Sequence, residues 1–557
     1  MFRSSCRRLF TLFVTGATLL SLAAAAAGAG PLRPRRDPPG ALPPTPLHPN
    51  ASAGLAMRYS GTPIDVTSYH YDNARTGWNP SETDLTPASV ASQRFGLLST
   101  LTVDGTVLAQ PLLVSNYRMP DQSVHDVLVV VTAHNSVYAF DAQNYALLWQ
   151  VSLGTSQSSD DVGCADHEPE YGIAATPVIV RRSSGSAVLY VVAATEPQPF
   201  EFHTRLHALS LGTGANVLPP VEIAPSARLS DGSTISYDAQ NQYVRAGLVS
   251  ANGSIYVSVA SHCDHAAETT SGWLLRYSLA LKLQASFHTI QKPAGYELAT
   301  IWMSGFAPAV DSAGNLFVVT GNGSFSRNGH NWGESALRLP AALGQPSDFF
   351  TPAGFAALNA ADDDFGSGGI VLLPLQPDQT APPLAVAMGK DAVLYLMDQG
   401  NLGGIRPRDS GVLQAQRLGP PGGGLWGGPA YYAGPNGAFV YCQIDSDLLR
   451  SYAVSAGDTP SLTAAASGTS PAGFGGSTPI VSSNGAAARS GVVWLIRRAA
   501  NVQLEAYDAL RLGAPIFAAS AGVWTNSWPN VLLTPLQANG RVYVPASGTV
   551  SVFGLTP

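Results

Sequence analysis

The chain has 557 residues with 56 glycines, 42 prolines and only 12% charged residues, which excludes a coiled coil and a charge-rich disordered protein. Its 30 basic and 37 acidic residues give a formal net charge of −7, and no basic cluster follows the first few dozen residues. Nucleic acid and anionic membrane surfaces are therefore not expected as partners.

The amino-terminal segment has the composition of an export signal. Three arginines precede an apolar run over residues 9–27, which ends in small residues suited to cleavage. A membrane anchor is the alternative, but the run is near the lower length limit for spanning and a Pro-rich stretch follows it. We expect a signal peptide over residues 1–30, a disordered linker over residues 31–63 and a single domain over residues 64–557.

The expected location follows from this leader. The mature protein is predicted to be exported, either to the periplasm or outside the cell, with no membrane span after signal removal. The pair Arg7-Arg8 leaves both the general secretory route and the twin-arginine route open.

From residue 95 onward, β-branched runs with period-2 alternation recur in a fixed order. Residues 109–113, 127–131 and 137–141 are the first examples of three strand types, and the same order returns about eight times at intervals of roughly 50–75 residues. This repetition predicts an all-β fold, an eight-bladed β-propeller of four-stranded antiparallel blades. Residues 95–101 would supply the outer strand of the last blade and close the ring. Two stacked β-sandwiches are the alternative.

Two stretches resemble the quinoprotein alcohol dehydrogenases. Residues 71–77 (Tyr-Asp-Asn-Ala-Arg-Thr-Gly) resemble the opening of that family, and residues 138–149 resemble its blade-docking repeat. The resemblance covers nearly the whole mature chain. It implies pyrroloquinoline quinone lying over a Trp, a Ca²⁺ that bridges quinone and protein, an Asp that acts as base, and a separate cytochrome or other electron acceptor. The implied substrate is an alcohol, which includes polyols and polymeric alcohols.

Four acidic or amide residues match the metal and base positions of the family. Asn322 lies in a Thr-Gly-Asn turn that resembles the one holding a Ca²⁺ ligand. Asp264 follows a strand where the family has a Ca²⁺-binding Glu, and Glu268 is the second choice. Asp364, in the run 362–365 after Thr351-Pro352, matches the catalytic Asp and is also a candidate ligand. Carboxylate and amide oxygens are the donors that Ca²⁺ requires.

Three further residues match positions at the quinone. Trp302 resembles the stacking Trp, and Trp426 resembles a second Trp of the pocket. Lys390 resembles the cationic residue that hydrogen-bonds the quinone oxygens, which also gives it a catalytic role in stabilising charge.

Propeller topology places these residues together without reference to the family. Asp264, Asn322 and Lys390 follow predicted second strands, whereas Trp302, Asp364 and Trp426 precede predicted first strands. Loops of both kinds emerge on the same face of a propeller, so we expect all six side chains at one rim. Cys164 and Cys263 fall on that rim as well and are the candidate disulfide, which leaves Cys442 unpaired.

Departures from the family leave a rival hypothesis open. Its pair of adjacent cysteines has no counterpart, since Ala165 follows Cys164, and the Arg expected nearby is missing. Three acidic residues, Asp166, Glu168 and Glu170, occupy that stretch and would repel a tricarboxylate. The rival is a propeller that has lost its cofactor and acts as a periplasmic or cell-surface binding or assembly scaffold. Its tryptophans would then be blade-packing residues and its polar residues turn or surface residues.

Overall fold

The structure is a computed structural model that describes residues 59–498, 501–525 and 533–556. The chain divides into two compact units, residues 1–52 and 53–557. The expected signal peptide and all of the linker before residue 59 lie outside the described residues, so the predicted domain boundaries stay predictions. Among the described helices, none is long and apolar enough to cross a membrane.

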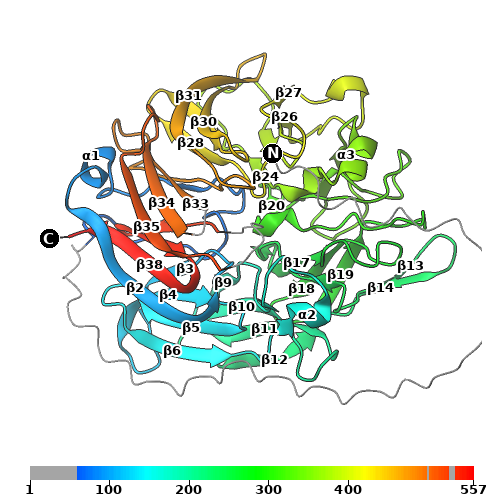
Figure 1. Cartoon of the computed structure of the whole chain (residues 1–557), viewed down its shortest axis with the longest axis horizontal. Helices are drawn as coiled ribbons and strands as arrows, with labels where there is room; N and C mark the ends of the chain where they lie inside the picture. The colour runs from blue at the N-terminus through cyan, green and yellow to red at the C-terminus, as the bar shows by residue number, and fades with distance from the viewer. Residues whose placement is uncertain (1–58, 499–500, 526–532, 557) are drawn as a thin grey trace, which may run out of the picture. The chain divides into compact units, whose positions relative to one another are not determined.

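Eight antiparallel sheets form the blades of a propeller, as the repeats predict (Figure 1). Blade 1 contains β3 (Leu112–Arg118), β4 (Val124–Val131), β5 (Ser136–Asp141) and β6 (Leu147–Ser152). Blade 2 contains β9 (Val178–Arg181), β10 (Ala187–Thr195), β11 (His203–Ser210) and β12 (Asn216–Glu222). Blade 3 contains β15 (Gln242–Tyr243), β16 (Val249–Ala251), β17 (Ser254–Ser261), β18 (Trp273–Ser278) and β19 (Leu283–His288). Blade 4 contains β20 (Ala309–Val310), β21 (Leu316–Val319), β22 (Ala336–Leu339) and β23 (Asp348–Phe350).

The remaining four blades continue the same order. Blade 5 contains β24 (Ile370–Leu372), β25 (Leu384–Ala387), β26 (Val393–Asp398) and β27 (Gln414–Arg417). Blade 6 contains β28 (Ala430–Gly434), β29 (Gly437–Cys442), β30 (Leu448–Ser455) and β31 (Ser461–Pro471). Blade 7 contains β32 (Ile480–Ser482), β33 (Val492–Arg498), β34 (Asn501–Asp508) and β35 (Phe517–Val523), with β1 (Trp78–Asn79) parallel to β32. Blade 8 contains β36 (Leu536–Ala538), β37 (Arg541–Pro545), β38 (Ser547–Leu555) and β2 (Phe95–Thr106).

Short elements occupy the connections between and within blades. Two small hairpins pair β7 (Gln157–Ser158) with β8 (Glu170–Tyr171) and β13 (Ser226–Arg228) with β14 (Thr234–Ser236). The helices are α1 (Pro87–Val90), α2 (Ser159–Val162) and α3 (Phe355–Ala361), with 3₁₀ turns η1 (Met303–Gly305), η2 (Phe365–Ser367) and η3 (Pro407–Asp409).

The ring closes where the two ends of the domain meet. Strand β2 lies antiparallel to β38, with Phe95 opposite Leu555 and Thr102 opposite Thr549, as the blue and red ribbons show in Figure 1. Closure removes the free sheet edges that an open arrangement would leave. The predicted role of residues 95–101 is thereby confirmed, and the sandwich alternative is wrong.

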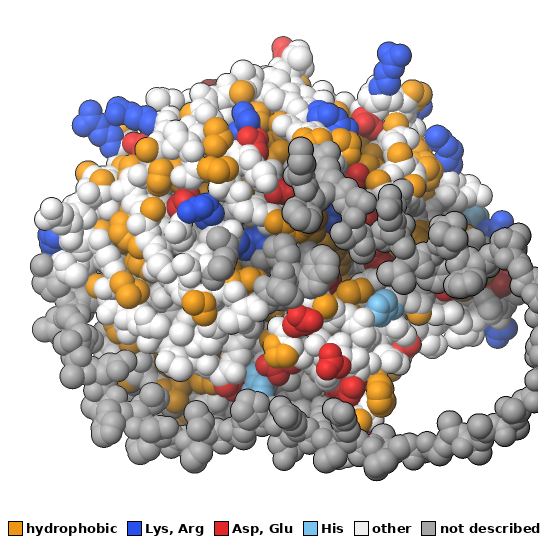
Figure 2. All heavy atoms as spheres, viewed as in Figure 1, with side chains coloured by type: hydrophobic (Ala, Val, Ile, Leu, Met, Phe, Trp, Pro, Cys, Tyr) orange, Lys and Arg blue, Asp and Glu red, His pale blue; other side chains and the backbone are white. Residues whose placement is uncertain are grey.

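The core lies between neighbouring blades. Every residue of β10 and β17 is buried, because each second strand packs against another sheet on both faces. On the face shown in Figure 2, the Lys and Arg side chains lie in separate small groups and form no continuous basic surface, in keeping with the composition.

The segment from residue 66 to residue 77 joins six blades. Six of its carbonyl oxygens each accept a backbone N–H from the innermost strand of a different blade, at 2.7–2.9 Å: Val66 from Leu113, Thr67 from Ile179, Asn73 from Val310, Ala74 from Leu372, Thr76 from Tyr431 and Gly77 from Val481. Arg75 is fully buried and donates from Nε to the carbonyl of Pro308 at 2.8 Å. The run 71–77, which resembles the family opening, is therefore hydrogen-bonded to the inner strands of several blades.

His70 in this segment makes the fold sensitive to acid. Its ring is fully buried and stacked on Tyr69 at 4.7 Å, and burial lowers its pKa to about 3 from an ordinary 6.5. The unfolded chain therefore binds the proton first, so the stability that the neutral ring confers is lost as the pH falls below 6.5. Between pH 6.5 and 4.5, His70 should cost about 2–3 kcal/mol of unfolding free energy.

Denaturant unfolding at a series of pH values tests this expectation. The variant His70→Asn should show a shallower fall in unfolding free energy over that range than the wild type, with each protein referred to its own stability at pH 7.5. Parallel curves for the two proteins would contradict it.

Candidate cofactor site

Asp364 lies at the centre of the predicted site. Helix α3 ends at Ala361, and the next residue, Asp362, takes a left-handed conformation. The chain then turns so that Asp364 occupies the N-cap position of η2, with its side chain buried and no capping hydrogen bond to that turn. Trp302 Nε1 donates to Oδ1 at 2.9 Å, and Lys390 Nζ lies 2.6 Å from Oδ2. Both oxygens of the buried carboxylate are thus held by groups from neighbouring blades.

The ionisable groups around Asp364 shift one another's pKa values. Burial raises the pKa of Asp364 to about 6 despite the opposing ammonium of Lys390, so its carboxylate predominates at neutral pH. Burial alone would lower the pKa of Lys390, but the carboxylates of Asp364 and Asp362 raise it above its ordinary value. Glu334 is fully buried nearby, and burial together with the charge of Asp364 holds its pKa well above the usual range. Glu334 accepts the Phe365 N–H at 2.7 Å.

Oxygen donors from three loops meet at Asn322. Its Nδ2 donates to Asp264 Oδ2 at 3.2 Å and to Asp362 Oδ1 at 2.7 Å. Its Oδ1 is buried and has no hydrogen-bond partner among the described residues. The two carboxylates lie at the nitrogen of this amide and its oxygen is left unpaired, so the oxygen donors that Ca²⁺ binds are gathered in this region.

Glu268, the second choice for a ligand, does not join this group. It is exposed, and no hydrogen bond or ion pair connects it to the other candidates within the described part of the chain. The left-handed turn at Cys263 and Asp264, with φ of 46° and 53°, directs the chain so that Asp264 takes the position instead.

Two cationic side chains lie against the indole of Trp302. The guanidinium carbon of Arg245 is 4.8 Å from the ring centroid, and Lys390 Nζ is 5.3 Å from it. Lys390 Nζ is also 5.6 Å from the ring of Trp426, which packs on the exposed ring of Phe474. A flat aromatic surface bordered by positive charge suits a planar anion such as pyrroloquinoline quinone.

The backbone around Trp302 is strained, and one glycine makes room for it. Leu298, Ala299, Met303 and Ser304 all have φ between 43° and 54°, a conformation that costs energy for non-glycine residues and concentrates at functional sites. A Cβ at Gly321 would lie 2.7 Å from Trp302 Nε1 and 3.1 Å from Asp364 Oδ1. The glycine of the Thr-Gly-Asn turn is therefore required for the contact between Trp302 and Asp364.

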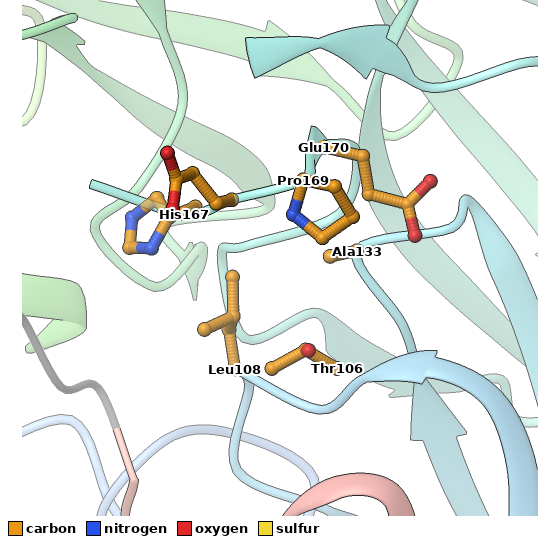
Figure 3. Close-up of a pocket in the computed structure, with 7 residues that line it drawn as sticks. Thr106, Leu108, Ala133, His167, Pro169 and Glu170 are labelled. Carbon is orange, nitrogen blue, oxygen red and sulfur yellow. The ribbon is translucent and has the colours of Figure 1, made fainter. Parts of the chain in front are cut away.

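The acidic stretch after Cys164 is partly neutralised. Asp166 Oδ2 lies 3.8 Å from Arg245 Nη1, and Glu170 Oε2 lies 2.9 Å from His134 Nδ1. Figure 3 shows the ring of His167 and the carboxylate of Glu170 on opposite sides of a small hollow that Leu108 and Ala133 also line. The repulsion expected for an anionic ligand is therefore reduced by cations that the sequence places elsewhere.

Cys164 and Cys263 form a disulfide, the predicted pairing, and Cys442 is a buried free thiol. The bond connects the segment after α2 with the loop that carries Asp264. Both sulfurs and a carboxylate oxygen of Asp166 lie within 4.8 Å of one another.

All six side chains expected at one rim belong to one network. Direct contacts run from Trp302 to Asp364, from Asp364 to Lys390, from Lys390 to Trp426 and, through Asp362, to Asn322 and Asp264. Their cofactor, metal and catalytic roles stay predictions.

Sequence reasoning missed three members of the site. The sequence patterns assign no role to Asp362, although it bonds both Lys390 and Asn322. Arg245 precedes strand β16 of its blade, just as Trp302 precedes β20. The expectation that loops before first strands reach the rim therefore applies to Arg245 as well. Glu334 precedes a third strand, and no sequence pattern distinguishes it.

Comparisons with known proteins identify the architecture. No protein-family model matches the sequence, and no curated protein matches it. Among solved structures, a quinohemoprotein alcohol dehydrogenase from Comamonas testosteroni is 14% identical, with a TM-score of 0.58 over 88% of this chain and 80% of that one. A quinohemoprotein alcohol dehydrogenase from Pseudomonas putida HK5 is 12% identical, with a TM-score of 0.56 over 88% and 80%. A europium-containing methanol dehydrogenase is 12% identical, with a TM-score of 0.55 over 89% and 98%. The chain therefore has the eight-bladed propeller fold of the quinoprotein alcohol and methanol dehydrogenases.

Proposed function

We propose that the protein oxidises an alcohol with pyrroloquinoline quinone and Ca²⁺ bound at the site around Asp364. The observation that carries the proposal is the buried carboxylate held at 2.9 Å by Trp302 and at 2.6 Å by Lys390. An acid whose pKa of about 6 leaves it deprotonated at neutral pH, yet close enough to that range to release its proton again, is suited to act as general base.

Each side chain of the site has a separate role in the proposed reaction. Asp364 accepts the hydroxyl proton of the alcohol as hydride leaves the carbon. Asn322, Asp264 and Asp362 would hold Ca²⁺, and Trp302 would support one face of the quinone, with Lys390 at its polar edge. The bound quinone supplies the two-electron acceptor that these side chains lack. The electrons then pass to a separate cytochrome or other acceptor.

We also propose an exported location. The Cys164–Cys263 disulfide fits an oxidising compartment, as does the leader over residues 1–30.

Reconstitution of the purified protein tests the proposal. Adding pyrroloquinoline quinone and Ca²⁺ should produce dye reduction with at least one member of a panel of primary alcohols, polyols and polyvinyl alcohol, and chelation of Ca²⁺ should abolish it. Protein that binds neither quinone nor Ca²⁺ in calorimetry would overturn the proposal and favour the scaffold hypothesis.

A further inference from the structure

In the part of the chain that the structure describes, Arg245 is a buried cation with two unpaired donors, whose one ion pair, with Asp166, is longer than a hydrogen bond. Its side chain is only 4% exposed, and neither Nε nor Nη2 has a hydrogen-bond partner within the described residues. The nearest carboxylate, Asp166, is 3.8 Å from Nη1, which is beyond hydrogen-bond distance. Burying a guanidinium with unused donors is costly, so its retention calls for an anionic group that completes it.

The aromatic rings packed around Arg245 do not supply that anionic group. Burial keeps the pKa of His167 well below the ordinary value, so its ring is neutral. The hydroxyl of Tyr243 is bonded to His167 Nε2 at 3.1 Å. Among the described residues, no group of this aromatic cluster is bonded to Nε or Nη2 of Arg245.

The position of Arg245 indicates what the missing group is attached to. Its guanidinium carbon lies 4.8 Å from the centroid of the Trp302 ring. A carboxylate bonded to the free Nε and Nη2 donors would belong to a molecule lying on or beside that indole. Arginine is suited to this task because its planar fork binds a carboxylate through two parallel hydrogen bonds.

We propose that Arg245 and Trp302 form a binding site for a planar aromatic carboxylate, with Asp166 as the group that the ligand's carboxylate displaces. The assignment to the quinone's own carboxylate rests on the proposed function, whereas the site itself does not. Arg245 would also provide the positive charge that the sequence lacks shortly after Cys164.

Calorimetric titration with three probes tests the site: pyrroloquinoline quinone, the redox-inert naphthalene-2,6-dicarboxylate, and the corresponding uncharged dicarboxamide. Arg245→Gln should weaken binding of both anions by about 10- to 100-fold and leave the diamide unchanged. Arg245→Lys should weaken the anions less, since it keeps the charge but loses the fork. Asp166→Asn should tighten them, because a competing carboxylate is removed.

Controls separate binding from folding. Arg276→Gln, in β18 of the same blade, should leave all three affinities unchanged, since its Nε is bonded to Ser254 at 2.9 Å. Arg245→Gln should not lower the melting temperature, because it removes an incompletely paired buried charge. A lowered melting temperature with unchanged anion affinity would show a structural role and overturn the proposal.

The outcomes distinguish this inference from the proposed function. Wild-type protein that binds the naphthalene dicarboxylate through Arg245 but not the quinone would support the site and reject the dehydrogenase proposal. Quinone binding that is equal in wild type and Arg245→Gln would reject the site and leave the dehydrogenase proposal standing. Failure to bind either anion would reject both.

Discussion

Replacing Asp364 with Asn is expected to lower alcohol turnover by about 10²- to 10⁴-fold, the usual contribution of a general base. Asparagine has nearly the same shape and keeps an oxygen to accept the 2.9 Å hydrogen bond from Trp302. It cannot accept a proton, and it leaves Lys390 with Asp362 as its remaining carboxylate at 3.1 Å. Steady-state rates with reconstituted enzyme would measure the loss, and quinone titration should give an affinity within a few-fold of wild type.

The adjacent residue provides a matched control. Asp363→Asn removes a half-buried carboxylate one position away that bonds neither Trp302 nor Lys390. Turnover of this variant should stay close to wild type. Equal activity of Asp364→Asn and Asp363→Asn would show that Asp364 is not the base, whereas loss of quinone binding in Asp364→Asn would show a structural role instead.

The fold was predictable because the strand order repeats. Eight copies of one pattern, together with an unpaired strand at residues 95–101, determine a closed ring before any loop is placed. The common position of Trp302, Asp364 and Lys390 follows from the same topology, because each lies in a loop on one face. This part of the site needed no knowledge of loop conformation.

The rest depended on contacts that only folding creates. Asp362 reaches Lys390 and Asn322 because α3 ends in a left-handed turn, a feature set by the surrounding loops. Arg245 meets Trp302 from another blade, and burial beside Asp364 raises the pKa of Glu334. Tertiary packing, rather than local propensity, decides each of these positions.

The cationic groups on Trp302 change how the departures from the family are judged. The sequence has Asp166 and no Arg shortly after Cys164, which predicts that the site repels an anionic ligand. Arg245 and Lys390 both lie against the indole, and they offset part of the negative charge of Asp166, Asp362 and Asp364 beside them. The acidic stretch alone is therefore not an argument for a propeller without cofactor.

Removing the disulfide is expected to have the largest effect on stability. Cys164 and Cys263 are 99 residues apart, and a cross-link closing a loop of that length reduces the entropy of the unfolded chain substantially. The double variant Cys164→Ser, Cys263→Ser should lose about 2–5 kcal/mol of unfolding free energy. Denaturant unfolding under non-reducing conditions would measure this loss. Cys442→Ala, which removes the buried free thiol, is the control for loss of a cysteine without loss of a cross-link.

The same variant should also weaken Ca²⁺ binding, which connects stability to the proposed function. The disulfide anchors the loop that presents Asp264 to Asn322 at 3.2 Å, and it lies beside Asp166, the partner of Arg245. Without the disulfide, Ca²⁺ binding has to order that loop, and the lost conformational entropy reduces the binding free energy. Calorimetry of the metal-free double variant should therefore show a lower Ca²⁺ affinity than the wild type. An unchanged affinity alongside a lowered stability would place Asp264 outside the metal site and leave Asn322 and Asp362 as its protein ligands.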